Sequence, residues 1–167
     1  MDPAVLRSLA RWPDVPAVYG WLALDRRGNW LLRETAAGRF GRIGNAALRD
    51  FISRNYAADE RGCWYFQNGP QRVYVGLAYT PLVVHYEGDA LFDHCGRPVE
   101  ALETYLDDEG SVLVLTERGI GLLDDRDLTR FADAAAPSAT LLRSEAAGRF
   151  GFVSDPRIPC ADPASSL

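Results

Sequence analysis

The sequence contains no lysine: all 18 basic residues are arginine, against 23 acidic residues, and the formal net charge is -5. This absence excludes the site chemistries that need a lysine amine, namely P-loop phosphate binding, Schiff-base formation and kinase-type phosphoryl transfer. Long apolar runs are also missing, because the longest one, 73–84, is broken by Gly76 and Pro81. It falls short of the ~20 residues that cross a bilayer, so no membrane partner is expected.

Cysteine is scarce as well. Cys63, Cys95 and Cys160 are an odd number at wide spacing, which argues against a disulfide framework and fits a reducing compartment. The start, Met1-Asp2-Pro3, does not fit a secretory signal, because an acidic residue stands at position 2. These features predict a cytoplasmic protein. The length of 167 residues corresponds to one domain, or to two small ones, at about 150 residues per domain.

Only two histidines are present, His85 and His94. No metal-ligand spacing surrounds them, and the adjacent His94 and Cys95 would point to opposite faces of a strand. A serine nucleophile is not indicated either, since the sequence has no G-x-S-x-G. We therefore expect no metal, no cofactor and no catalytic residue.

Three helices are predicted. Asp2 is a good N-cap with Pro3 at the first helical position, which predicts a helix up to Arg11. Asn45 is expected to cap a second helix, and Asp124 or Asp125 a third that carries Leu128 and Phe131. Between them, short β-prone runs punctuated by Gly and Asn indicate an antiparallel meander. The runs are 18–24, 30–33, 63–67, 72–75, 82–86, 90–92, 99–106, 111–116, 140–143 and 149–153, while 34–41 is expected as a loop and Gly119 and Gly121 as breaks.

Charge and sequence similarity both divide the chain. Residues 1–86 hold 11 arginines and 7 acids, and residues 87–167 hold 7 arginines and 16 acids. The resulting charges are +4 for the first half and -9 for the second. An excess of four positive charges is too small for a nucleic-acid-binding surface, so no nucleic acid is expected. Gly28 with Gly110, and Leu48-x-x-Phe51 with Leu128-x-x-Phe131, recur at offsets of 82 and 80 residues. A more literal repeat, 31–41 with 141–151, has an offset of 110 and conflicts with the first.

These patterns predict an α+β fold of two duplicated units, each with antiparallel strands and one helix. The expected boundaries are 1–86 for the first unit, 87–153 for the second and 154–167 for a disordered tail. Pro156, Pro159 and Pro163 are the reason for the tail.

Polar and aromatic residues are densest between residues 61 and 81. On a strand, Trp64 and Phe66 would share one face, and Tyr65 and Gln67 the other. The first face is expected in the core, while the second, together with Arg72, can stack a planar group or bind an anion. The alternative is an ordinary solvated sheet face with structural tyrosines.

Several motifs in 18–84 resemble an uncharacterised bacterial family, a domain of unknown function. They are Leu24-Asp25-x-x-Gly28-x-Trp30, Arg42-Ile43, Leu48-x-x-Phe51, Asp59-x-x-Gly62-x-Trp64-Tyr65-Phe66, Val73-Tyr74-Val75 and Pro81. The resemblance implies two duplicated α+β units, the second similar to a pleckstrin-homology fold, with a nucleotide-like ligand at their junction and a role in signalling. This sequence departs from the family where its Thr-Pro-x-Glu-Lys becomes Asn68 to Arg72, which places Gln71 at the glutamate position and Arg72 at the lysine position.

The sequence thus favours a non-enzymatic binding or regulatory protein for a small anionic, nucleotide-like ligand. The expected contacts are Arg42, Trp64, Gln67, Arg72 and Tyr79. A protein-interaction module using sheet edges is the alternative. An unrecognised enzyme is a further one, which a pocket joining His85 or His94 to a carboxylate would favour.

Overall fold

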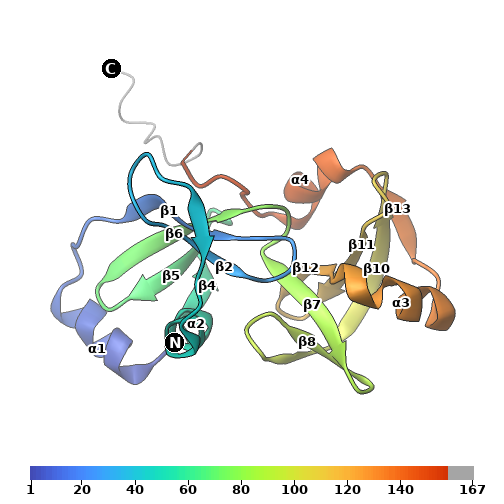
Figure 1. The fold of residues 1–167 in the computed structure, drawn as a ribbon, viewed down its shortest axis with the longest axis horizontal. Coiled ribbons are helices and arrows are strands. Elements are labelled where there is room, and N and C mark those ends of the chain that lie inside the picture. The colour runs from blue at the N-terminus through green and yellow to red at the C-terminus, as the bar shows by residue number, and fades with distance from the viewer. Residues whose placement is uncertain (158–167) are drawn as a thin grey trace. The chain divides into compact units, whose positions relative to one another are not determined.

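The chain forms two compact units in a computed structural model that describes residues 1–157 (Figure 1). Unit 1 comprises Met1–Leu24, Trp30–Ala78 and, of the described residues, 153–157. Unit 2 comprises Asp25–Asn29 and Tyr79–Phe152. The expected boundary after residue 86 is therefore too late. The strand from Leu82 to Glu87 pairs inside the second unit, and strand pairing rather than the charge split decides membership.

Unit 1 is a six-stranded sheet, sheet 1, with two helices. Its order is β3-β2-β1-β6-β5-β4. Its elements are α1 (Pro3–Arg11), β1 (Val18–Leu24), β2 (Trp30–Arg33), β3 (Phe40–Arg42), α2 (Ala46–Arg54), β4 (Tyr56–Ala58), β5 (Trp64–Asn68) and β6 (Gln71–Leu77). The predicted hairpin and helices are confirmed, whereas β3 begins inside the segment 34–41 that was expected as a loop.

Local signals explain both helices of unit 1. Asn45 Oδ1 accepts a hydrogen bond from the Leu48 backbone nitrogen at 3.0 Å, as an N-cap should. Asp2 precedes α1 as expected, but its side chain caps nothing in that helix. Its carboxylate instead pairs with Arg54 at 3.3 Å, and its backbone nitrogen donates to Asn55 Oδ1 at 2.7 Å. Asp2 therefore fastens α1 to the end of α2.

Unit 2 is a seven-stranded sheet, sheet 2, with two α-helices and two 3₁₀ turns. Its order is β13-β10-β11-β12-β7-β8-β9. Its elements are β7 (Leu82–Glu87), β8 (Ala90–Asp93), β9 (Pro98–Val99), β10 (Ala101–Asp107), β11 (Val112–Thr116), β12 (Gly119–Leu123), η1 (Asp125–Asp127), α3 (Leu128–Ala134), β13 (Ala139–Leu141), η2 (Arg143–Glu145) and α4 (Ala146–Phe150). Each unit thus carries two α-helices, not the single one expected.

The two sheets repeat one strand order. Each has two three-stranded meanders, joined because its sixth strand lies parallel to its first: β6 beside β1, and β12 beside β7. The predicted α+β class with two repeated units is confirmed, but the sheets are mixed rather than purely antiparallel. This order aligns β4–β5 with β10–β11, so Gly62 corresponds to Gly110, and the predicted pairing of Gly28 with Gly110 is wrong.

Strand β12 was not expected, because Gly119 and Gly121 appeared to interrupt the chain. It is nevertheless a buried strand between β11 and β7. A Cβ at Gly121 would lie 2.8 Å from Val84 Cγ1. Gly121 therefore lets β7 approach closely, which is one of the positional uses of glycine in a strand.

The end of unit 2 also differs from expectation. Residues 149–153 do not form a closing strand, because α4 runs to Phe150 and ends at Gly151, whose φ of 66° gives a left-handed C-cap. The six-residue sequence at 36–41 thus forms a loop and part of β3, whereas the identical sequence at 146–151 forms α4. The literal repeat consequently has no structural counterpart.

The disorder expected from residue 154 is wrong for residues 154–157. The Leu77 backbone nitrogen donates to Ser154 O at 2.8 Å, and Pro156 is buried. The remainder of that predicted tail, 158–167, lies outside the described residues.

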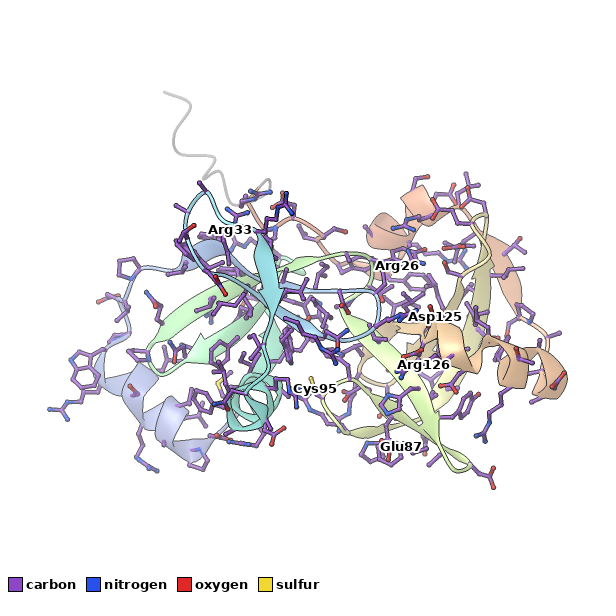
Figure 2. The ribbon with its side chains drawn as sticks, in the orientation of Figure 1. Arg26, Arg33, Glu87, Cys95, Asp125 and Arg126 are labelled. Atoms are coloured by element: carbon purple, nitrogen blue, oxygen red, sulfur yellow. The ribbon has the colours of Figure 1, made fainter. Side chains whose placement is uncertain are left out.

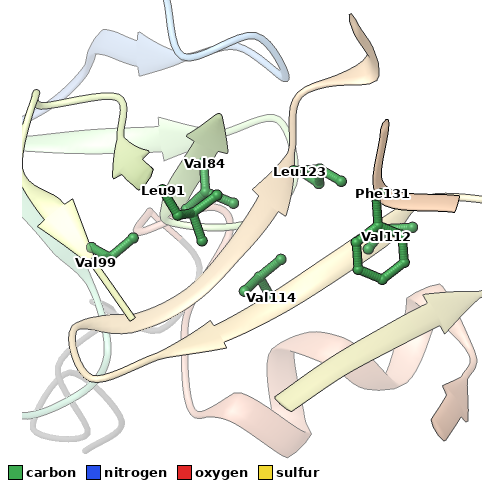
Figure 3. Packing of buried hydrophobic residues seen from close by; sticks show 7 residues of the cluster. All are labelled: Val84, Leu91, Val99, Val112, Val114, Leu123 and Phe131. Carbon is green, nitrogen blue, oxygen red and sulfur yellow. The ribbon is translucent and has the colours of Figure 1, made fainter. Parts of the chain in front are cut away.

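The core of unit 2 lies between its sheet and α3. Figure 3 shows seven buried residues of this core from β7 to α3: Val84, Leu91, Val99, Val112, Val114, Leu123 and Phe131. Within residues 1–157, no helix is long and apolar enough to span a membrane.

Candidate functional site: an arginine and tyrosine cluster in unit 1

The two faces of sheet 1 have different surroundings. Phe66 packs edge-on against Phe51 of α2, with ring centroids 5.4 Å apart. Tyr65 pairs with Tyr74, and Gln67 with Arg72, in the β5–β6 register, so these four side chains lie on the other face. The predicted alternation of side chains along this strand is confirmed, but its second face is not open as expected, because Tyr65 and Tyr74 are buried in a cluster with Cys63 and Gln67 is fully buried.

The β4–β5 turn positions the polar end of this face. Asp59 Oδ1 accepts hydrogen bonds from the backbone nitrogens of Arg61, at 2.9 Å, and Cys63, at 3.0 Å. Gly62 has a φ of 79°, which glycine adopts without strain. The Asp-x-x-Gly sequence therefore fixes the turn and leaves the second carboxylate oxygen of Asp59 for side chains.

That oxygen and the Tyr74 hydroxyl gather two guanidinium groups. The Tyr74 hydroxyl donates to Asp59 Oδ2 at 2.9 Å, and Arg61 donates to the same oxygen at 3.0 Å. Arg61 also donates to the Tyr74 hydroxyl oxygen, at 3.2 Å, and Arg72 interacts with that hydroxyl from β6. We call Asp59, Arg61, Tyr65, Arg72 and Tyr74 the Arg–Tyr cluster.

Stacked rings hold the Arg–Tyr cluster in place. The guanidinium carbon of Arg72 lies 4.4 Å from the centroid of the Tyr65 ring, within cation–π range. Tyr19 stacks on Tyr74 with centroids 4.7 Å apart and planes 3° apart. Tyr65 and Tyr74 are buried, while Arg72 is half-buried and Arg61 exposed. The rings thus form a rigid base below two positive charges.

The charges of the Arg–Tyr cluster do not balance. Burial alone would raise the pKa of Asp59, but hydrogen bonds from Tyr74 and Arg61 hold it below its usual value, so the carboxylate is ionised. Burial and the Asp59 carboxylate raise the pKa of Tyr74, so its hydroxyl stays neutral. Arg72 forms no ion pair with any carboxylate of residues 1–157. The cluster therefore carries two guanidinium charges and one carboxylate.

The structure separates the five expected contact residues. Arg72 belongs to the Arg–Tyr cluster. Gln67 lies opposite Arg72 but is fully buried, and its amide nitrogen donates to Gly69 O at 2.9 Å. Trp64 occupies the α2 face of the sheet, against Tyr56 at 4.8 Å.

The last two expected residues lie elsewhere. Arg42 is exposed on β3, which three inter-strand spacings, roughly 14 Å in total, separate from β6. Tyr79 belongs to unit 2, where its hydroxyl donates to Asp107. The single binding group expected from the sequence is therefore not assembled within unit 1.

Both histidines lie in unit 2. His85 Nε2 lies 3.0 Å from Glu87 Oε1, in a pair that is exposed on β7. His94 and Cys95 do not point to opposite faces of a strand as expected, because they lie in the turn after β8, with Nε2 and Sγ 3.6 Å apart. Cys95 is labelled in Figure 2. In the described part of the chain, no group of three potential metal ligands is present.

Sequence reasoning missed Asp59, although a signal was available. Four turns share the form Asp-x-x-Gly, at Asp25, Asp59, Asp93 and Asp107. In each, the aspartate side chain accepts from backbone nitrogens two and four residues later. The turn fixes the backbone of its middle residues, and in two of the four turns it displays an exposed arginine, Arg61 or Arg26, at a fixed place.

Comparisons with known proteins agree with this fold. Two DUF1285 family proteins of known structure are similar at low identity. The one from Silicibacter pomeroyi DSS-3 has 17% identity and a TM-score of 0.51, over 75% of this chain and 74% of its own. The one from Shewanella baltica OS155 has 16% identity and a TM-score of 0.50, over 69% and 92%. At these identities the likeness extends to the fold alone.

Curated proteins give no match. The family DUF2944, described as "Protein of unknown function (DUF2946)", matches residues 1–151. The predicted resemblance to an uncharacterised family is thus confirmed, and the chain belongs to this family of unknown function.

Proposed function

We propose that the protein is a binding module whose Arg–Tyr cluster holds the anionic group of a small ligand. The observation that carries this proposal is Arg72. Its guanidinium lies over the Tyr65 ring, reaches the Tyr74 hydroxyl and lacks a carboxylate partner among the described residues. A guanidinium presents a planar fork of N–H donors that matches a phosphate or carboxylate group.

The ligand class follows from the charges and the rings. Arg61 donates to the Tyr74 hydroxyl oxygen at 3.2 Å, and Arg72 lies over the neighbouring Tyr65 ring, so an anion bound beside these rings would meet both guanidinium groups. A phosphate monoester fits two guanidinium groups better than a carboxylate does, because it offers three oxygens. Tyr65 and Tyr74 are buried, whereas Tyr19, which stacks on Tyr74, is half-buried, so a planar base beside the anion would lie next to Tyr19. A mononucleotide, as the family resemblance implied, therefore remains the ligand of choice.

Thermal shift with inorganic phosphate, AMP and GMP tests this function. A ligand that binds only the folded state raises the melting temperature as its concentration increases. We expect a rise with at least one nucleotide, and an affinity lower by about tenfold in Arg72→Gln, since about 1.4 kcal/mol corresponds to tenfold. Arg72→Lys should fall between the two, because lysine keeps the charge but not the fork.

The matched control is Arg7→Gln. Arg7 is exposed on α1 in the same unit, and its replacement by glutamine changes the net charge by the same amount as Arg72→Gln does. The proposal fails if no anion stabilises the protein at millimolar concentration, or if Arg7→Gln weakens binding as much as Arg72→Gln does.

A protein partner is a second candidate, which the edge of sheet 1 favours. The β1–β2 register continues to place Trp21 opposite Arg33, and Arg33 pairs with Phe40 on the edge strand β3. Both aromatic residues are 37% exposed, and Arg33 lies 4.8 Å from the Phe40 ring. Affinity capture should then recover one partner with the wild type and lose it with Phe40→Ser, while Arg72→Gln leaves it unchanged.

A further inference from the structure

Two of the cavities in unit 2 differ in the charges of their linings. One, of about 400 Å³, is lined by Asp107, Asp108 and Glu145 and has no basic residue in its lining. The other, of about 350 Å³, is lined by Arg26, Arg27, Glu109, Gly110, Ser111, Leu122, Leu123, Asp125 and Leu128. We call the second one the Arg26 cavity. Its volume lies within the ~300–1,000 Å³ that is usual for small-molecule sites.

Buried neighbours hold Arg26 in position. Its guanidinium donates to Ser111 Oγ at 2.8 Å and lies 5.4 Å from the centroid of the Tyr79 ring. Ser111 and Tyr79 are both buried. They are joined through Asp107, which accepts from the Ser111 backbone nitrogen at 2.7 Å and from the Tyr79 hydroxyl at 2.9 Å. Arg26 therefore stands on a hydrogen-bonded base, although its own side chain reaches solvent.

The other charges at this cavity are already paired. Arg27 forms an ion pair with Asp125 at 2.8 Å, and Arg143 forms one with Glu109. Arg26 and Asp125 are labelled in Figure 2. Arg26 has no carboxylate within ion-pair distance among residues 1–157. A guanidinium has five N–H donors, and the Ser111 hydroxyl engages only one nitrogen. The charge that remains for a ligand is thus positive.

Three leucines also line the cavity. Leu122 and Leu123 are buried strand residues of β12, and Leu128 begins α3. Leu123 belongs to the core of unit 2 (Figure 3), so this part of the lining is rigid. Apolar ligand surface that covers it gains roughly 25 cal/mol for each Å² removed from water.

We propose that the Arg26 cavity binds a small amphipathic anion, with its carboxylate or phosphate group on Arg26 and its hydrocarbon or ring on the three leucines. This site is distinct from the Arg–Tyr cluster and shares no residue with it. Neither the family nor the sequence patterns assign it.

A matched set of eight-carbon probes tests the inference by calorimetric titration of the full chain. Octanoate and octyl phosphate carry both features, octanol lacks the charge, and acetate lacks the chain. We expect at least one of the first two to bind saturably, and octanol and acetate to bind about tenfold more weakly or worse. The tighter of the two anions identifies the preferred head group.

Variants separate the two halves of the cavity. Arg26→Gln should weaken anion binding by about tenfold and leave octanol unchanged, since a charged hydrogen bond is lost. Leu128→Ser should weaken both probes. Arg118→Gln, on the exposed β11–β12 turn of the same unit, is the charge control and should change neither.

The outcomes also distinguish this site from the proposed function. Arg72→Gln should leave octanoate binding unchanged, and Arg26→Gln should leave the response to nucleotides unchanged. The inference is overturned if neither anion saturates the protein, or if Arg26→Gln, shown to be folded by its melting temperature, binds octanoate as the wild type does.

Discussion

Tyr79 donates its hydroxyl hydrogen to Asp107 Oδ2 at 2.9 Å, and both side chains are buried in unit 2. Burial, followed by the Asp107 carboxylate, raises the pKa of Tyr79, so the hydroxyl remains a donor at neutral pH. The other carboxylate oxygen of Asp107 accepts hydrogen bonds from the backbone nitrogens of Glu109 and Ser111 in the β10–β11 turn. This single bond therefore links the start of unit 2 to the turn that carries Ser111.

Tyr79→Phe should lower the free energy of unfolding by about 1–3 kcal/mol, because it leaves a buried carboxylate oxygen without its donor. Urea denaturation measures the change. Tyr86→Phe is the matched control in the same unit, since the Tyr86 ring packs against the core and Arg130 but its hydroxyl donates no hydrogen bond to a described residue. Equal stability of Tyr79→Phe and wild type would refute the role of this bond.

Acid should destabilise the protein through His94. Burial lowers the pKa of His94 to about 3. The charges of Arg97 and His85 lower it further by smaller amounts, and the charge of Asp25 acts in the opposite direction. Its Nδ1 accepts a hydrogen bond from the Val83 backbone nitrogen at 3.2 Å. Since the unfolded chain has a histidine pKa of about 6.5, it binds more protons than the folded chain between these values. Stability is therefore complete above pH 6.5 and falls as the pH decreases.

Lowering the pH from 7 to 5 should reduce the free energy of unfolding of the wild type by about 2 kcal/mol through His94 alone. The loss is about 1.36 kcal/mol for each pH unit below 6.5. His94→Asn retains an acceptor for Val83 but does not titrate, so its loss over this interval should be smaller by that amount. Urea denaturation at both pH values measures it. Parallel losses in the two proteins would show that His94 contributes nothing.

Local chemistry made much of this fold predictable. Asn45, Pro3 and the Asp25 turn act through neighbours within four residues, and α1, α2 and the β1–β2 hairpin stand where the sequence placed them. The errors concern the short strands β3, β4 and β9, together with β12 and α4. The need for glycine at position 121 follows only from the approach of Val84, and the sequence that forms the five-residue helix α4 and its cap forms no helix at 36–41. Tertiary surroundings decide such segments.

The candidate site was predictable in part for the same reason. Strand periodicity placed Tyr65 and Arg72 on one face correctly, since alternation is a property of the strand itself. It could not show that Gln67 is covered, because that depends on elements distant in sequence. The contact between Asp59 and Arg61 is local to the Asp-x-x-Gly turn and was open to prediction.

The charge balance of the Arg–Tyr cluster can be altered at Asp59. Asp59→Asn keeps an oxygen for the turn nitrogens but removes the negative charge opposite Arg61 and Tyr74. We expect stability to fall by about 1–3 kcal/mol, as a charged hydrogen-bond acceptor is lost. Affinity for phosphate should nevertheless rise, because the anion no longer competes with the carboxylate. Titration of folded Asp59→Asn tests this, and a weaker affinity than that of the wild type would contradict it.

Two glycine substitutions should act in opposite directions within unit 2. At Gly121, an added methyl would lie 2.8 Å from Val84 Cγ1 and 3.4 Å from Leu82 Cβ, between two paired strands that leave no room to move apart. Gly121→Ala should therefore destabilise by about 1–3 kcal/mol through overpacking. At Gly148, within α4, the same methyl meets nothing within 4 Å. Gly148→Ala should stabilise by up to about 1 kcal/mol, because alanine favours a helix.

Thermal denaturation of the two variants and the wild type distinguishes a buried strand β12 from the chain break that the sequence suggests at Gly119 and Gly121. If Gly119 and Gly121 interrupted the chain in a loop, Gly121→Ala would be neutral. A buried β12 requires a lower melting temperature for Gly121→Ala and an unchanged or higher one for Gly148→Ala. Because the Arg26 cavity takes Leu122 and Leu123 from β12, Gly121→Ala should also weaken octanoate binding, while Gly148→Ala should not.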